Sequence, residues 1–112
     1  RVPSSGRIRK VLYHPGRYFA AFREKSSLDN EQNGVLMETE GGDPVLFVQI
    51  AGFLARRIVC RLQEGQEVTR GSRYGLIRFG SRLDLYVPLH YNLTAVVGER
   101  VRGGETILAR KG

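Results

Sequence analysis

The chain of 112 residues has one cysteine, no tryptophan, two histidines and only three lysines. The single cysteine, Cys60, excludes an intramolecular disulfide. Its apolar neighbours Ile58 and Val59 predict a small buried side chain, which is compatible with a cytoplasmic compartment. No run approaches the ~20 apolar residues of a membrane-spanning helix. The opening residues Arg1–Gly6 do not resemble a signal peptide, and the missing initiator Met leads us to expect a fragment or a processed product.

Several catalytic and metal-binding patterns are also missing. The sequence contains no P-loop, no G-x-S-x-G elbow and no Cys/His spacing typical of a metal site. The histidines, His14 and His90, are too few to build a zinc site alone, so we expect no metal and predict that each histidine is exposed or caps a turn.

Positive charge is in excess. Lys and Arg number 18 against 11 acidic residues, which gives a net charge of +7. Such a balance favours a polyanionic partner, although an ordinary Arg-rich solvated surface explains it as well. No aromatic signature of RNA binding accompanies the charge. We therefore rank an anionic membrane or a phosphate group above a nucleic acid, and keep a basic nucleic-acid-binding β-barrel as an alternative.

Fourteen glycines separate short apolar runs, a pattern that predicts an all-β fold of many short strands. Turns are expected at His14–Arg17 and Gly41–Pro44. A short helix is compatible with the aromatic spacing in Arg17–Lys25, and the polar segment Ser26–Asn33 is predicted to be a loop. The predicted strands are Gly6–Leu12, Val35–Glu40, Pro44–Ile50, Ile58–Leu62, Tyr74–Phe79, Ser81–Pro88 and Thr106–Arg110.

A short repeat suggests the architecture. Gly65–Gly71 and Gly98–Gly104 both fit G-x-x-V-x-x-G and are offset by 33 residues. Paired units of this kind resemble the halves of a barrel-sandwich hybrid, the architecture of lipoyl and biotinyl carrier domains. A carrier needs a modifiable Lys between the halves, and Pro88–Val97 has none. We predict one domain over residues 1–112, with a non-catalytic carrier or binding module as an alternative function.

Gly80-Ser81 is an unusual pair within a β-rich stretch. A serine hydroxyl can attack the preceding carbonyl, and glycine tolerates the backbone distortion that this requires. Elimination of the resulting ester leaves dehydroalanine, which hydrolyses to a pyruvoyl group. Such a ketone forms a Schiff base with an amine and accepts electrons on decarboxylation. The dipeptide alone is common, and taken by itself it is better explained as an ordinary turn.

Six stretches together give the dipeptide a context, because in order they resemble the short form of phosphatidylserine decarboxylase over nearly all of the chain. They are Arg1–Arg7 (RVPSSGR), Tyr13–Gly16 (YHPG), Asn30–Asn33 (NEQN), Gln49–Val59 (QIAGFLARRIV), Gly75–Pro88 (GLIRFGSRLDLYVP) and Val101–Ala109 (VRGGETILA).

The resemblance implies a proenzyme that cleaves itself between Gly80 and Ser81. Residues 1–80 would belong to the β subunit and residues 81–112 to the α subunit, with Ser81 converted to the catalytic pyruvoyl group. The implied reaction is decarboxylation of phosphatidylserine to phosphatidylethanolamine by a peripheral enzyme on the cytoplasmic side of the cell membrane. It implies no nucleic acid, and it leaves a homo-oligomer open.

Substrate contacts are predicted at Arg56, Arg57 and His14. The alternative for the two arginines is that one points to solvent and the other pairs with a carboxylate. The family places a His immediately before the Val-Pro-x-Ser-Gly stretch and an Asp farther upstream, whereas this chain begins at Arg1. We therefore expect the chain alone to process itself poorly. We do not expect His14 or His90 to replace the missing base.

Overall fold

The computed structural model describes residues 1–16, 30–52, 57–78 and 81–112, and these form strands, turns and loops but no helix. The all-β prediction is therefore confirmed. The strands are β1 (Gly6–His14), β2 (Gln32–Thr39), β3 (Pro44–Ala51), β4 (Ile58–Cys60), β5 (Glu67–Val68), β6 (Gly75–Ile77), β7 (Ser81–Tyr86), β8 (Tyr91–Leu93) and β9 (Ala109–Lys111).

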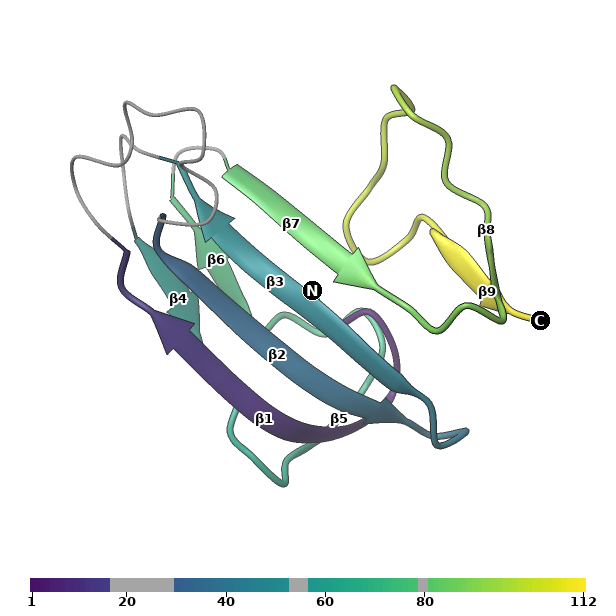
Figure 1. Cartoon of the computed structure of the whole chain (residues 1–112), viewed down its shortest axis with the longest axis horizontal. Coiled ribbons are helices and arrows are strands. Elements are labelled where there is room, and N and C mark those ends of the chain that lie inside the picture. The colour runs from purple at the N-terminus through teal and green to yellow at the C-terminus, as the bar shows by residue number, and fades with distance from the viewer. Residues whose placement is uncertain (17–29, 53–56, 79–80) are drawn as a thin grey trace.

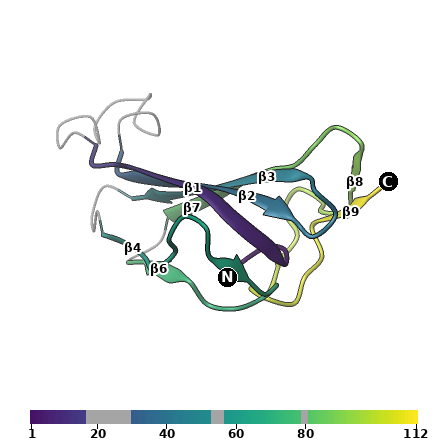
Figure 2. The same ribbon diagram turned by 90° about the horizontal axis from the view of Figure 1, so that it is seen from below.

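The main element is a curled sheet of five strands in the order β5-β1-β2-β3-β7 (Figure 1). All of its neighbouring strands are antiparallel. The pair β4–β6 lies beneath one face of this sheet (Figure 2), and the pair β8–β9 lies beyond the end of β7. The sheet therefore forms a half-barrel whose inner face is covered by residues 57–78.

The core follows from strict alternation along β2 and β3. Val35 lies opposite Phe47 and Met37 opposite Val45, and all four are at most 3% exposed. Directly opposite residues share one face, so these pairs form the inner face of the half-barrel. Tyr74, which immediately precedes β6, packs edge-on against Phe47 of β3 with ring centroids 5.3 Å apart. This contact joins the β4–β6 layer to the main sheet. Val2, Ile8 and Leu62 complete the buried cluster.

One glycine is required where β4 meets β6. Gly75 lies opposite Cys60, and a Cβ on Gly75 would come within 1.9 Å of the Val59 carbonyl oxygen. No side chain fits at that distance, so the close approach of these two strands depends on glycine.

Each of the seven predicted strands overlaps an observed one, with ends shifted by up to three residues in the described part of the chain. Two short strands, β5 and β8, were not predicted. The loop prediction for Ser26–Asn33 is wrong at its end, because Gln32 and Asn33 begin β2. Polar residues usually indicate a loop, but here they begin a strand whose buried face starts with the polar side chain of Asn33. The helix predicted over Arg17–Lys25 lies outside the described residues, as does the first part of that loop.

The two G-x-x-V-x-x-G units have matching conformations. Gly65 and Gly98 have φ of 85° and 88°, and Gly71 and Gly104 have φ of 80° and 81°, a region that favours glycine. The turn hydrogen bonds repeat with the same offset: Gln66 N to Gln63 O matches Glu99 N to Val96 O, and Ser72 N to Thr69 O matches Glu105 N to Arg102 O. The repeat is therefore structural as well as sequential.

Candidate functional site

The Gly80–Ser81 junction lies where β7 begins. Gly80 is outside the described residues, and of Ser81 the structure describes the backbone. Six consecutive pairs join β7 to β3, from Ser81 opposite Ala51 to Tyr86 opposite Leu46. In the order of the main sheet β7 is an edge strand, so the residue after the predicted cut is held in a ladder on one side only.

The hydrogen bonds of Ala51 show how Ser81 is held. The Ala51 amide donates to the Glu31 carbonyl oxygen at 2.9 Å, and the Ala51 carbonyl accepts from Asn30 Nδ2 at 2.9 Å. Both backbone groups of Ala51 thus face β2. In an antiparallel sheet, a residue whose N–H and C=O both point to the strand on one side forms a non-hydrogen-bonded pair with the residue opposite it on the other side. For Ala51 that opposite residue is Ser81. The amide nitrogen of Ser81 is therefore not bonded to β3.

The core face becomes polar at this end of the sheet. Glu31, Asn33 and Gln49 are 7%, 2% and 3% exposed. Asn33 Nδ2 donates to Gln49 Oε1 at 3.1 Å, and Gln49 Nε2 donates to the Val59 carbonyl oxygen at 3.3 Å. These bonds connect β2, β3 and β4 through the interior, and a buried polar group is stable only when it is bonded in this way.

Glu31 is the exception in this cluster. The Tyr13 hydroxyl donates to Glu31 Oε2 at 2.5 Å, but Glu31 Oε1 is buried and has no hydrogen-bond partner in the described part of the chain. An unsatisfied buried acceptor costs about 1–3 kcal/mol. The Glu31 backbone carbonyl accepts a hydrogen bond from Ala51, and Ala51 lies opposite Ser81. Glu31 is therefore level with the junction, two strands away from it.

The histidines do not lie beside Ser81. His14 ends β1 opposite Gln32, at the level of Arg82 but three strands from β7, which is about 14 Å along the sheet. His90 lies at the far end of β3, with Nε2 3.6 Å from Asp43 Oδ1. The substrate contact predicted for His14 is untested, and it would have to reach across two intervening strands.

Arg78 and Arg82 lie close to the junction in sequence, and Arg57 is joined to Arg78 through the backbone. Arg57 precedes β4, and its carbonyl accepts the Arg78 amide at 3.1 Å. Arg57 and Arg78 are both exposed. Arg82 follows the junction and forms an ion pair with Asp84 at 2.8 Å. Arg56 lies outside the described residues, so its predicted contact is untested, as is that of Arg57.

A metal-binding cluster and a membrane-spanning helix are both absent from the described residues. These residues contain no group of three or more His, Cys, Asp or Glu side chains that could hold a metal ion. Within the same residues, no helix has the length and apolar character to cross a bilayer.

Sequence reasoning missed Glu31, Asn33 and Gln49 as parts of the site. Their alternation was visible: Glu31 and Asn33 continue the series Val35, Met37 at two-residue spacing, and Gln49 continues Val45, Phe47. Polar residues in phase with a buried apolar series indicate a bonded interior network rather than a loop.

A family model and individual relatives assign the chain to the same family. The model of the phosphatidylserine decarboxylase family matches residues 1–109. A phosphatidylserine decarboxylase proenzyme from Rickettsia akari is 53% identical over 109 residues, covering 97% of this chain and 47% of the relative. Another from Nitratidesulfovibrio vulgaris is 54% identical over 111 residues, covering 99% of this chain and 51% of the relative. The chain thus spans about half the length of these relatives. No solved structure matches it.

Proposed function

Because this chain belongs to the phosphatidylserine decarboxylase family, we propose that it carries the self-cleavage junction of a pyruvoyl-dependent enzyme that decarboxylates phosphatidylserine. The cut falls between Gly80 and Ser81, so residues 1–80 contribute to one subunit and residues 81–112 to the other. The family match favours neither the carrier nor the nucleic-acid alternative.

The observation that carries the proposal is the position of Ser81 at the first residue of a paired strand. Its amide is not bonded to β3, because the backbone groups of Ala51 face Glu31 and Asn30. The peptide bond before Ser81 can therefore change geometry without breaking the β3–β7 ladder. All six pairs of that ladder lie on the product side of the cut.

The cleavage chemistry balances within the chain. The Ser81 hydroxyl loses its proton and attacks the Gly80 carbonyl carbon, and the C–N bond breaks as the amine takes up a proton. Elimination of the ester then gives a carboxylate on Gly80 and dehydroalanine at position 81. Addition of water and loss of ammonia complete the pyruvoyl group. The residues present fit this cofactor, because it is made from a serine that follows a glycine, the residue type that best tolerates backbone distortion.

Once formed, the pyruvoyl group supplies a ketone that captures an amine and accepts electrons during decarboxylation. The chain's own contribution is to hold that terminus and to attract an anionic lipid. The exposed guanidinium groups of Arg57 and Arg78 support a role in binding the phosphate of the headgroup. Basic residues near a membrane contribute about 1 kcal/mol each, which fits peripheral attachment to the anionic cytoplasmic face.

The test uses the 112-residue chain and a hybrid proenzyme, in which this sequence replaces the matching 111 residues of the Nitratidesulfovibrio relative. Intact-mass spectrometry of the hybrid proenzyme should give two fragments that sum to its mass plus water minus ammonia. The fragment beginning at position 81 should have a blocked terminus. Cleaved protein should release carbon dioxide from vesicles that contain phosphatidylserine.

Ser81→Ala provides the matched control, because it removes one oxygen atom and leaves the strand pairing possible. It should abolish both cleavage and decarboxylation. An intact wild-type hybrid proenzyme, or a Ser81→Ala variant that still cleaves at this bond, would refute the proposal. The unmodified relative, purified in parallel, shows that the assay detects cleavage.

A further inference from the structure

The segment that contains the second repeat unit exposes large apolar side chains. The core cluster and the apolar residues packed against it all precede Leu89. Beyond that point six large apolar side chains are between 50% and 104% exposed, and a concentration of this kind marks an interaction surface. They are Leu89, Leu93, Val96, Val97, Val101 and Ile107.

The first repeat unit shows what can cover such a surface. Ile8 exchanges two backbone hydrogen bonds with this unit: its carbonyl accepts from Gly65 at 2.7 Å and its amide donates to Gln66 at 2.8 Å. Val2 does the same with Gly71 and Ser72, with both bonds at 2.8 Å. Val2 and Ile8 are buried. The opening segment of the chain therefore lies along the first unit as an added strand.

The equivalent groups of the second unit are the amides of Gly98 and Gly104 and the carbonyls of Glu99 and Glu105. Within the described ranges none of these four groups bonds to another segment. Their turns nevertheless match those of the first unit in φ and in internal hydrogen bonds. The second unit thus presents backbone groups like those of the first without an added strand bonded to them, and its Gly104 lies beside Arg1 and beside Gly71 of the first unit.

We propose that an extended segment from the further half of the full-length proenzyme docks on the second repeat unit, as Arg1–Ile8 docks on the first. The matched relatives are about twice as long as this chain, so the family has sequence to supply it. A second copy of this chain is a poorer occupant, because its own Arg1–Ile8 is already paired with its first unit.

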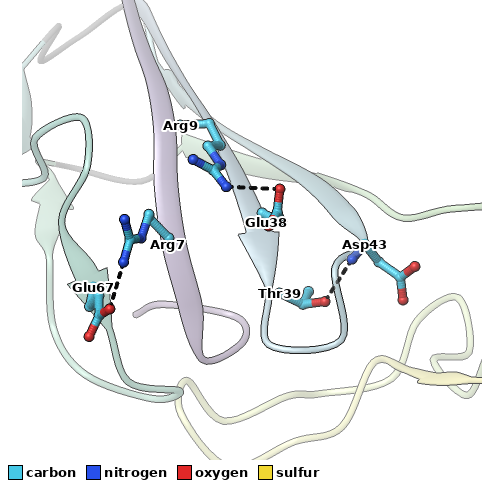
Figure 3. A network of polar contacts seen from close by, with 6 residues as sticks. All are labelled: Arg7, Arg9, Glu38, Thr39, Asp43 and Glu67. Atoms are coloured by element: carbon cyan, nitrogen blue, oxygen red, sulfur yellow. Dashed lines mark hydrogen bonds and ion pairs between the residues drawn. The ribbon is translucent and has the colours of Figure 1, made fainter.

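The repeat also specifies the chemistry of that segment. It carries two apolar residues six positions apart, as Val2 and Ile8 are. On the first unit Glu67 forms an ion pair with Arg7 at 2.8 Å (Figure 3), and 33 residues later Arg100 stands in the place of Glu67. The docking segment therefore has an acidic residue where Arg1–Ile8 has Arg7, since like charges directly opposite are destabilising.

Amide hydrogen exchange measured by NMR tests this in the 112-residue chain and in the hybrid proenzyme carrying Ser81→Ala, which cannot be cut. The result is therefore independent of the proposed cleavage. In the 112-residue chain the Gly98 and Gly104 amides should exchange about 100-fold faster than the matched amides of Gly65 and Gly71. In the hybrid proenzyme all four should be protected to within about tenfold. Rapid exchange of Gly98 and Gly104 in the hybrid proenzyme would overturn the proposal.

Variants provide a second measurement. Val101→Glu should lower the melting temperature of the hybrid proenzyme by about 5 °C or more while leaving the 112-residue chain unchanged. Leu12→Glu, at an exposed apolar position on β1, serves as the matched control and should change neither protein. If Val101→Glu prevents folding of the hybrid proenzyme, Val101→Thr should give a smaller shift of the same kind. Equal shifts in both proteins, or protection of Gly98 that grows with the concentration of the chain, would contradict the proposed occupant.

Discussion

The Tyr13 hydroxyl donates a 2.5 Å hydrogen bond to Glu31 Oε2, and the other oxygen of that carboxyl group is buried without a hydrogen-bond partner among the described residues. Tyr13 lies on β1 and Glu31 immediately precedes β2, at the polar end of the core face. This side-chain bond therefore holds a buried carboxyl group at the level of the Gly80–Ser81 junction.

The substitution Tyr13→Phe should destabilise the chain by about 1–3 kcal/mol, because it removes the hydroxyl that donates a hydrogen bond to the buried Glu31 carboxyl group. Urea unfolding followed by circular dichroism measures the free energy. Leu12→Ala, at the neighbouring exposed position on β1, is the control and should change stability by less than about 0.5 kcal/mol.

Glu31→Gln should make the Tyr13→Phe change less costly, because an amide is cheaper to leave unpaired than a carboxylate. The double-mutant cycle isolates this coupling. Independent, additive effects of the two substitutions would show that the bond does not stabilise the buried carboxylate.

His14→Ala and His90→Ala should leave the extent of self-cleavage in the hybrid proenzyme unchanged. Both side chains are separated from Ser81, one by two intervening strands and the other by the length of β3. Intact-mass spectrometry after a fixed incubation provides the ratio of cut to uncut protein. A loss of about 100-fold or more in cleavage rate, the size expected for removal of a general base, would mean that one of these histidines reaches the junction.

Acid should release the pair β8–β9 from the main sheet. Asp43 in the β2–β3 turn accepts hydrogen bonds from Lys111 Nζ at 3.0 Å and from the Tyr91 hydroxyl at 2.9 Å. These bonds, led by that from Lys111, lower the pKa of Asp43. A carboxyl group with a lowered folded pKa stabilises the protein above its unfolded pKa of about 3.9 and loses that contribution as the pH falls further.

Amide exchange of β8 and β9 should therefore be constant from pH 7 to about pH 4, after correction for intrinsic rates, and should accelerate below that. Asp43→Asn should show the faster exchange already at pH 7 and little further change in acid. A variant that keeps the wild-type acid transition would assign the transition to another group.

Gly75→Ala should destabilise the chain by about 2–3 kcal/mol, because the new methyl group would meet the Val59 carbonyl oxygen and push β4 away from β6. Gly103→Ala is matched in chemistry but has open space around it and should stay within about 0.5 kcal/mol. Thermal unfolding of both variants provides the comparison. Similar melting temperatures for the two would mean that the β4–β6 approach adjusts freely.

Much of this fold could be predicted because its strands alternate. The series through Val35 and Met37 and through Val45 and Phe47 made β2 and β3 predictable, and the G-x-x-V-x-x-G offset led directly to two matching turns. Strands β5 and β8 have two and three residues, too few for a period to appear, and they exist because tertiary partners pair with them.

The assignment of Gly80-Ser81 as the cleavage site stays a prediction, made from the residues that flank it in sequence. Glu31, Asn33 and Gln49 are in phase with the buried apolar series, but the polarity of Glu31 and Asn33 led to a loop prediction. The backbone groups of Ala51 point toward Glu31 because of the register in which β2, β3 and β7 pair. Register is not determined by the few residues around Ala51, so it could not be predicted from them.

The ladder between β3 and β7 has a consequence for the two-chain protein that the proposed cleavage would produce. Before cleavage, residues 81–112 are tethered to the sheet and rebind at the high effective concentration of an intramolecular contact. After a cut before Ser81 the same six pairs and the bonds to Asp43 must hold two separate molecules. A folding equilibrium then becomes a binding equilibrium, and dilution becomes a variable that can separate the subunits.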